Sequence, residues 1–117
     1  MGANPSMTRP PGVNKSPDPV KKPTLAAVLI VKNEADNLRA CLASLDGLVD
    51  EIVILDSGSQ DDTPAIAAEF GARFFVNTVW PGFGRQRRLA QSHVQSEWVL
   101  WLDADERLTP ELKAAIA

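Results

Sequence analysis

Four short apolar runs alternate with segments of helical periodicity, and this alternation constrains the fold more than any other feature of the chain. The runs cover Leu25–Val31, Glu51–Leu55, Arg73–Val76 and Trp98–Leu102. The helical segments begin after Lys32–Glu34, at Thr63–Pro64, at about Arg85 and at Thr109–Pro110, where each Thr-Pro pair fits an N-cap and a first helical position. This order is typical of a mostly parallel sheet with helices on both faces, so we predict an α/β fold.

The first 24 residues differ from the rest in composition. They hold six of the nine prolines, four basic residues, one acidic residue and only five apolar ones. Such a segment buries too little apolar surface to offset its conformational entropy, so we predict a disordered tail over 1–24 and a folded domain over 25–117. The tail is either a solvated leader or a contact for anionic lipid or a partner.

Composition excludes several classes of protein. The chain is 44% apolar, carries a formal net charge of −3 and has one cysteine, Cys41. The longest apolar run has seven residues, whereas a membrane span needs about 20. These values argue against a nucleic-acid-binding protein and against an internal disulfide. We expect a soluble, cytoplasmic protein. We also expect Cys41 and the single histidine, His93, to be structural.

Three polar clusters, at 32–34, 56–62 and 103–106, each follow a predicted strand directly. In parallel sheets, ligands bind outside the carboxyl ends of the strands. Asp103 and Asp105 lie two residues apart, so on extended backbone their carboxylates share one side and suit Mg²⁺ or Mn²⁺. The alternative is a solvated acidic turn.

The other two clusters each allow two interpretations. Asp56 ends a strand before Ser57 and Gly58, where it either accepts hydrogen bonds from a ribose or base or belongs to a polar loop leading to the next helix. Asn33 is either a helix N-cap or part of the same binding mouth. The segment 80–88 contains three arginines, which suit phosphate binding or form a solvated helix face.

Four segments together resemble the family-2 inverting glycosyltransferases. They are LAAVLIVKNEADNLRACLASL, EIVILDSGSQDDT, WPGFGRQRRLA and WVLWLDADERLTPEL. The likeness covers about 24–117 and is closest to the enzymes that add glucose to the inner core of bacterial lipopolysaccharide. It implies a GT-A, Rossmann-like fold, a nucleotide-diphosphate sugar donor such as UDP-glucose, a glycan or lipid-linked acceptor, and a cytoplasmic location with peripheral contact to the inner membrane.

The resemblance also assigns roles to residues. Asp103 and Asp105 match the family's DxD, which binds the divalent metal and the nucleotide-sugar, with Asp105 as the direct metal ligand. The other positions that it implies for nucleotide-sugar binding are Lys32, Asn33, Glu34, Asp56, Ser57, Gly58 and Arg87. The chain departs from the family at Ser57, where a second Asp is common, and at Arg88, where Asn is common.

In the family the general base lies well downstream of the DxD, and this chain extends twelve residues past Asp105. The resemblance therefore implies the donor-binding half of an enzyme, truncated after the DxD strand, with no catalytic base among these residues. We expect that the chain alone does not catalyse transfer and that its open sheet exposes an apolar edge.

Other functions fit parts of the pattern. A catalytically silent nucleotide-binding or interaction module would have the same pocket. A nucleotidyltransferase also uses carboxylate-bound Mg²⁺, but no Gly-rich, Lys-containing phosphate loop follows the first strand. A haloacid-type phosphatase has its Asp-x-Asp after the first strand, whereas here it follows the fourth.

Overall fold

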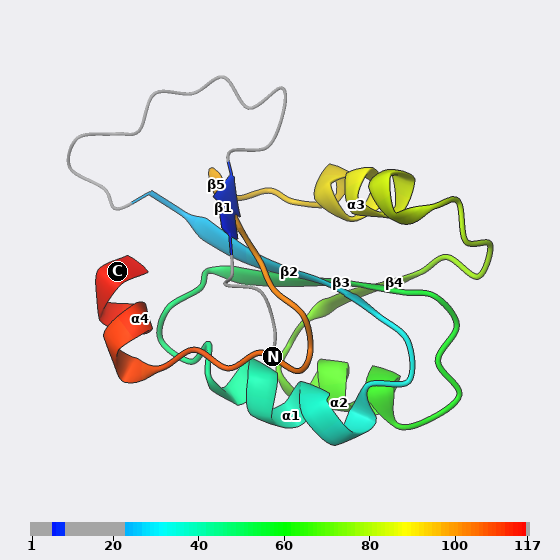
Figure 1. The fold of residues 1–117 in the computed structure, drawn as a ribbon, viewed down its shortest axis with the longest axis horizontal. Coiled ribbons are helices and arrows are strands. Elements are labelled where there is room, and N and C mark those ends of the chain that lie inside the picture. Colours follow the sequence, from blue (N-terminus) through cyan, green and yellow to red (C-terminus); the bar gives the residue numbers. More distant parts are fainter. Residues whose placement is uncertain (1–5, 9–22, 117) are drawn as a thin grey trace.

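The computed structural model describes residues 6–8 and 23–116 and arranges them as one sheet with helices on both sides (Figure 1). In chain order the elements are β1 (Ser6–Thr8), β2 (Leu25–Val31), α1 (Ala35–Ala43), β3 (Glu51–Asp56), α2 (Thr63–Glu69), β4 (Arg73–Val76), α3 (Phe83–Ser92), β5 (Trp98–Trp101) and α4 (Pro110–Ile116). The order of the strands across the described sheet is β1-β5-β2-β3-β4.

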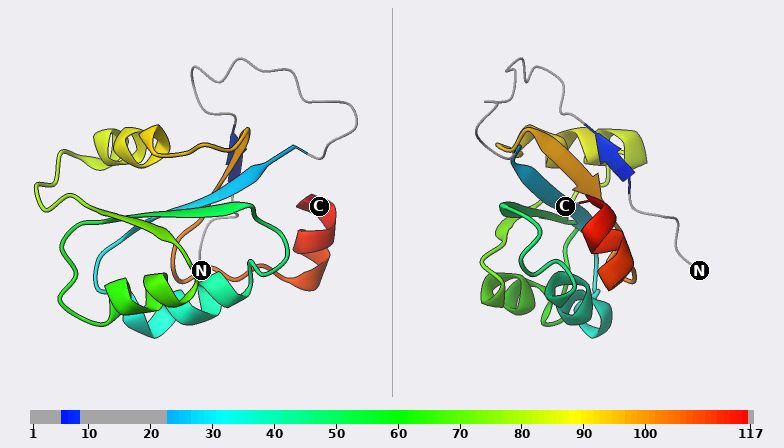
Figure 2. Two further views of the ribbon diagram at one scale, coloured as in Figure 1. Left: turned by 180° about the vertical axis from the view of Figure 1, so that it is seen from behind. Right: turned by 90° about the vertical axis from the view of Figure 1, so that its left-hand side faces the viewer.

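The four strands from β2 to β5 run parallel, as the strand–helix alternation predicted. β2 lies at the centre and pairs with β3 on one side and β5 on the other, while β4 pairs with β3. Helices α1 and α2 cover one face of the sheet and α3 covers the other (Figures 1 and 2). The prediction of a mostly parallel sheet with helices on both faces is therefore confirmed.

The central strands are apolar along their whole length because both faces are buried. Alternate residues of β2 enter different clusters: Leu29 packs with Leu38 of α1, whereas Val28 packs with Ala90 of α3. The first five residues of β2 are all buried. A strand buried on both faces has no polar face to alternate with, so the continuous apolar run is the pattern this position requires.

Strand β1 corrects the prediction of a disordered tail for three of its residues. Met7 pairs with Leu100 of β5 in antiparallel register, and the Trp101 indole Nε1–H donates to Thr8 Oγ1 over 3.1 Å. The outer edge of β5 offers unpaired backbone groups, which explains how a segment without apolar periodicity joins the sheet. The expected open edge is thereby covered at β5. Of the rest of the predicted tail, Thr24 accepts the backbone N–H of Trp98 over 3.0 Å, and 1–5 and 9–22 lie outside the described residues.

Two helix starts differ from the sequence-based prediction. Asp62, and not Thr63, is the N-cap of α2, and Thr63 is fully buried inside the helix. Helix α3 begins at Phe83, two residues before the predicted start. The cap of α4 is as predicted, because the Leu112 backbone N–H donates to Thr109 Oγ1 over 3.1 Å.

Candidate functional site

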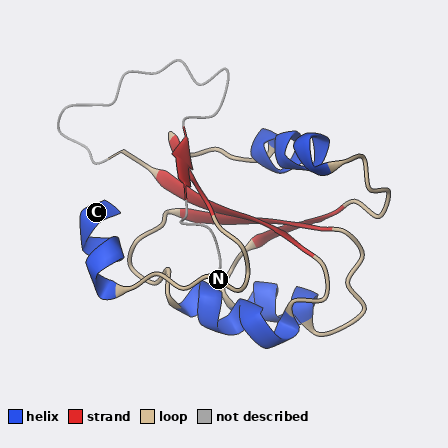
Figure 3. Ribbon diagram, viewed as in Figure 1, coloured by secondary structure: helices blue, strands red, loops and turns tan. Residues whose placement is uncertain are grey.

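The carboxyl ends of β5, β2 and β3 bring the three polar loops to one edge of the sheet (Figure 3). At the end of β2, Val31 pairs with Asp56 of β3. Trp101, the last residue of β5, pairs with Val28, so the loop that carries Asp103 leaves the sheet slightly before β2 ends. The parallel topology alone therefore collects residues that lie up to about 70 positions apart in sequence.

The loop after β3 is built around a buried carboxylate. Asp56 is 1% exposed, and its Oδ2 accepts the backbone N–H groups of Gly58 and Ser59 over 2.8 and 2.7 Å. The Ser59 hydroxyl also donates to Asp56. Gly58 has φ of +112°, a conformation that favours glycine. Asp56 thus holds the shape of its own loop, and its predicted contact with a ribose or base stays a prediction.

Asn33 joins the loop after β2 to the loop after β3. Its backbone N–H donates to Ser59 Oγ over 2.7 Å, and its side-chain Oδ1 accepts the Gln60 N–H over 2.7 Å. Its φ is +52°, which asparagine tolerates better than most residues. Of the two interpretations of Asn33, the N-cap is wrong, because Glu34 holds that position. That Asn33 belongs to a binding mouth stays a prediction.

Asp61 and Thr63 complete this connection at the start of α1. The Glu34 N–H donates to Thr63 Oγ1 over 3.0 Å, and the Ala35 N–H donates to Asp61 Oδ2 over 3.1 Å. A hydrogen bond from the Thr63 hydroxyl is the main cause that holds the pKa of Asp61 below its usual value. Sequence reasoning missed this role of Thr63, because its donor comes from 29 residues earlier in the chain.

The loop after β5 presents two carboxylates to solvent. Asp103 and Asp105 are exposed, while Ala104 between them is buried. The Asp103 N–H donates to Glu106 Oε1 over 2.7 Å, which closes the turn. Within the described part of the chain, neither the Asp103 nor the Asp105 carboxylate has a hydrogen-bond partner in the structure, so both are available to a ligand.

The donor set fits a cation that shares its ligands with a substrate. Among residues 6–8 and 23–116, no three or more Asp, Glu, His or Cys side chains gather as a metal cage. Mg²⁺ commonly takes one or two carboxylates and completes its octahedron with waters and substrate phosphates. Two exposed carboxylates two residues apart match that partial set, with Asp103 and Asp105 as the residues that would hold the ion.

Arg107 ties this loop to the loop after β2. Its guanidinium donates to the carbonyls of Ala104 and Glu106 over 2.7 and 2.8 Å, and to Asn37 Oδ1 over 3.4 Å. Asn37 in turn donates to Glu34 Oε2 over 3.3 Å. A chain of hydrogen bonds therefore runs from Glu34 to the turn that carries the two aspartates.

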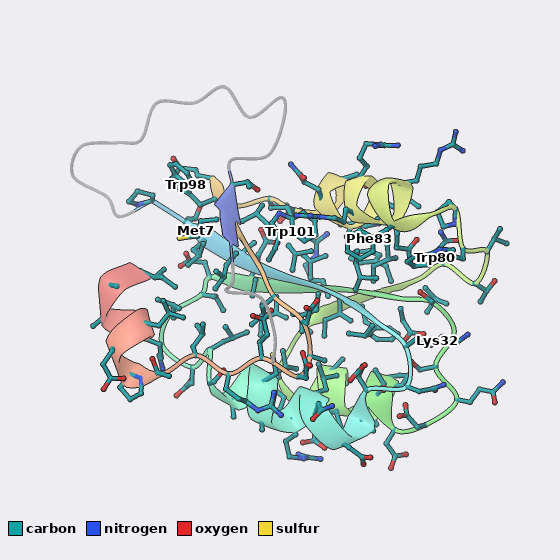
Figure 4. All side chains as sticks on the ribbon, viewed as in Figure 1. Met7, Lys32, Trp80, Phe83, Trp98 and Trp101 are labelled. Atoms are coloured by element: carbon teal, nitrogen blue, oxygen red, sulfur yellow. The ribbon has the colours of Figure 1, made fainter. Side chains whose placement is uncertain are left out.

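A cleft of about 360 Å³ opens at the ends of β2 and β3. It brings together three of the predicted site residues, Lys32, Glu34 and Ser57, with two aromatic residues that the sequence did not single out for the site, Trp80 and Phe83. Figure 4 labels Lys32, Trp80 and Phe83 of this lining. The remaining lining residues are Ile30, Val31 and Thr78. The other predicted site residues described above lie outside this lining.

Helix α3 contributes a buried anchor and a stacked arginine. Gln86 is fully buried, accepts from Asn77 Nδ2 over 3.0 Å and donates to Ser57 Oγ over 3.4 Å. The Arg87 guanidinium lies 4.4 Å from the centre of the Trp101 ring. Arg85 and Arg88 are exposed, which fits both a solvated helix face and phosphate binding. The anchoring role of Gln86 could not be predicted from the sequence, since a polar residue on a helix is usually exposed.

Cys41 and His93 occupy structural positions, as predicted. Cys41 is fully buried in the core, and burial raises the pKa of its thiol to about 12. The His93 ring stacks on Phe75 with 3.6 Å between centroids. Neither residue therefore supplies a nucleophile or a metal ligand to the edge of the sheet where the polar loops meet.

Comparison with known sequences identifies a family. Residues 26–117 match the family described as Glycosyl transferase family 2. A glycosyltransferase from Rickettsia felis is 40% identical over 92 residues, which cover 79% of this chain and 32% of the relative. The lipopolysaccharide core biosynthesis glycosyltransferase LpsC from Rhizobium meliloti is 36% identical over 99 residues, covering 80% of this chain and 36% of LpsC.

Solved structures agree with this match. Glucosyl-3-phosphoglycerate synthase from Mycobacterium tuberculosis, in complex with Mn²⁺, uridine diphosphate and glucosyl-3-phosphoglycerate, superposes with a TM-score of 0.58 and 32% identity over 73% of this chain and 36% of that one. Mannosyl-3-phosphoglycerate synthase from Rubrobacter xylanophilus superposes with a TM-score of 0.65 and 29% sequence identity. The match covers 76% of this chain and 33% of that one.

The chain thus spans about a third of the length of the relatives it matches. In the described part of the structure no helix has the length and apolarity needed to cross a membrane. The sheet order, the helices on both faces and the match over 26–117 agree on a GT-A fold. The chain belongs to glycosyl transferase family 2.

Proposed function

We propose that the chain forms the donor-binding part of an inverting glycosyltransferase. Its ligand is a nucleotide-diphosphate sugar, UDP-glucose in our proposal, held together with Mg²⁺ or Mn²⁺ at the edge of the sheet where the polar loops meet. The observation that carries the proposal is the meeting of three loops at the carboxyl ends of the strands, one with the exposed Asp103 and Asp105 carboxylates and two with the cleft-lining Lys32, Glu34 and Ser57.

The loop after β5 and the loops after β2 and β3 have different roles in this proposal. Asp103 and Asp105 would hold the divalent ion, which when bound would supply a Lewis acid to neutralise the charge of the diphosphate. Asp56 and Asn33 keep the neighbouring loops in shape through their hydrogen bonds, with Gly58 allowing the tight turn. Arg87, close to this end of α3, adds positive charge toward the nucleotide.

Two relatives support the choice of ligands. The Mycobacterium tuberculosis synthase was solved with Mn²⁺ and uridine diphosphate, and LpsC acts in lipopolysaccharide core biosynthesis. We therefore propose uridine diphosphate as the nucleotide, a divalent cation as the cofactor and a cytoplasmic enzyme with a glycan or lipopolysaccharide core acceptor. The acceptor hydroxyl would attack the anomeric carbon opposite the leaving nucleotide and invert its configuration, with its proton taken by a general base.

Calorimetric titration tests the donor site directly. UDP and UDP-glucose are titrated into the chain with and without Mn²⁺, and the titrations are repeated on Asp105→Asn. We expect Mn²⁺ to tighten binding at least about tenfold, because a divalent cation held by Asp103 and Asp105 would offset the repulsion between these carboxylates and the diphosphate. Asp105→Asn is expected to abolish this gain.

Asp46→Asn is the matched control, because Asp46 is also an exposed aspartate but follows α1, away from the three loops. It is expected to bind as the wild type does. Equal affinity with and without Mn²⁺ in a folded wild-type chain would contradict the assignment of Asp103 and Asp105.

A further inference from the structure

We propose that Trp80 and Phe83 form an aromatic wall on which the planar base of the donor nucleotide stacks. This inference rests on the proposed function and assigns a part of the donor to the cleft. Both side chains line it, and they are 53% and 59% exposed. Large aromatic side chains that are this exposed and line a cleft have apolar surface in contact with water. A planar ligand that stacks on them would bury that surface.

The wall is held in place by the rest of the fold. Gly82 precedes α3 with φ of +99°, which lets the chain turn sharply between the two aromatic residues. Buried Gln86, one turn into α3, bonds to Asn77 and Ser57. The start of α3 is therefore fixed to the loop after β3, and the two rings keep their tilted arrangement with centroids 6.5 Å apart.

Polar groups complete the lining. Lys32, Glu34 and Ser57 belong to the same cleft and offer an ammonium group, a carboxylate and a hydroxyl. A nucleobase presents a flat π face and an edge with both donors and acceptors, so it fits an aromatic wall combined with such groups. The combination of stacking surface and polar partners is what makes the cleft suited to a base.

The position of the cleft favours the base over the sugar. In a nucleotide-diphosphate sugar the nucleoside and the sugar lie at opposite ends of the diphosphate. The diphosphate is assigned to Asp103 and Asp105, neither of which lines the cleft, so the cleft takes one end only. A hexose ring is puckered and presents hydroxyls around its rim, whereas the base is the flat end that an aromatic wall stacks against.

Titration of Trp80→Ala and Trp80→Phe tests the wall. The probes are UDP, UDP-glucose and inorganic pyrophosphate, each with Mn²⁺. Trp80→Ala is expected to weaken UDP and UDP-glucose equally, at least about fivefold, the lower end of what base–aromatic stacking contributes. Pyrophosphate binding is expected to stay unchanged, and Trp80→Phe is expected to recover most of the affinity for UDP.

Val79→Ala is the matched control, since Val79 is 75% exposed, adjacent to Trp80 and not part of the cleft lining. Unchanged UDP affinity in Trp80→Ala would overturn the proposal, and so would a loss confined to UDP-glucose, which would assign the wall to the sugar. Pyrophosphate weakened as much as UDP would point to a general disturbance and also overturn it. If the folded wild type binds no UDP at all, the proposed function itself fails, and that result is seen before any variant is made.

Discussion

Asp56 is the residue on which the shape of the loop after β3 depends. Its buried carboxylate accepts two backbone N–H groups and the Ser59 hydroxyl, and Ser59 then accepts the N–H of Asn33. Two loops of the candidate site therefore rest on one side chain. A charged acceptor can be buried here because its partners are all supplied within three residues and need no long-range packing.

We predict that Asp56→Ala lowers the free energy of unfolding by about 2–3 kcal/mol, because it leaves the N–H groups of Gly58 and Ser59 without their charged acceptor. Asp56→Asn keeps one acceptor oxygen and is expected to cost about half as much or less. Urea unfolding at neutral pH measures both variants. An Ala variant as stable as the wild type would mean that the loop finds other partners.

At the scale of elements, the carboxyl and amino ends of the strands have different roles. The carboxyl ends carry the polar loops of the candidate site. The amino ends carry an ionic connection centred on Glu51 at the start of β3. Glu51 accepts the N–H groups of Gln95 and Ser96 over 2.8 and 2.6 Å and the Ser96 hydroxyl over 2.7 Å. Arg73 of β4 lies 3.2 Å away. The turn before β5 is thereby attached to β3 and β4.

We predict that Glu51→Gln lowers the free energy of unfolding by about 1–2 kcal/mol at pH 7 and leaves ligand binding unchanged. Burial acts to raise the pKa of Glu51, but hydrogen bonds from Ser96, the Gln95 backbone and Arg73 together hold it below its usual value. A lowered folded-state pKa stabilises the fold above the unfolded-state pKa, and this contribution is lost as the pH falls through the folded-state value. The difference between wild type and variant should therefore shrink as the pH falls below about 4.

Urea unfolding at several pH values measures this difference. The control is Glu69→Gln, which removes the exposed pair between Glu69 and Arg39 and is expected to lower the stability less than Glu51→Gln does, because solvent screens an exposed pair. A difference for Glu51→Gln that does not vary with pH would contradict the role assigned to its charge.

The central elements were predictable from the sequence because their environment leaves a local pattern. Leu25–Val31 is apolar throughout since α1 and α3 cover its two faces, and Thr109 precedes Pro110 as a cap because the cap is made within three residues. Strand β1 was not predictable, since Ser6–Thr8 carries no such pattern and its pairing depends on the edge of β5, about 90 residues later. A feature made by residues close together in sequence can be predicted from the sequence. A strand whose pairing depends on a distant edge strand cannot.

The candidate site divides in the same way. Parallel topology was enough to predict that the clusters at 32–34, 56–62 and 103–106 lie at the carboxyl ends of the strands, and the structure brings their loops there. It did not predict that Asn33 bonds to the Ser59–Gln60 loop or that Trp80 lines the cleft, because both depend on how two loops pack across space. The side chain that a ligand meets is thus harder to predict than the edge where it binds.

At the scale of the whole molecule, the stability of the sheet depends on how its outer strands are covered. β1 pairs with β5 over three residues, Ser6 with Trp101, Met7 with Leu100 and Thr8 with Val99. An uncovered edge presents a row of backbone N–H and C=O groups to which another chain can add a strand. In this chain, β1 is the described element that satisfies the outer edge of β5.

We predict that Met7→Pro makes the chain self-associate at lower concentrations than the wild type does, within the micromolar range. Proline lacks the backbone N–H and resists pairing inside a strand, so the substitution releases β1 and uncovers β5 without shortening the chain. Met7→Val is the matched control, because it removes the same side chain but keeps the N–H and favours the extended conformation. Sedimentation velocity at several concentrations measures the effect; if Met7→Pro sediments as the wild type does at every concentration, β1 does not protect this edge.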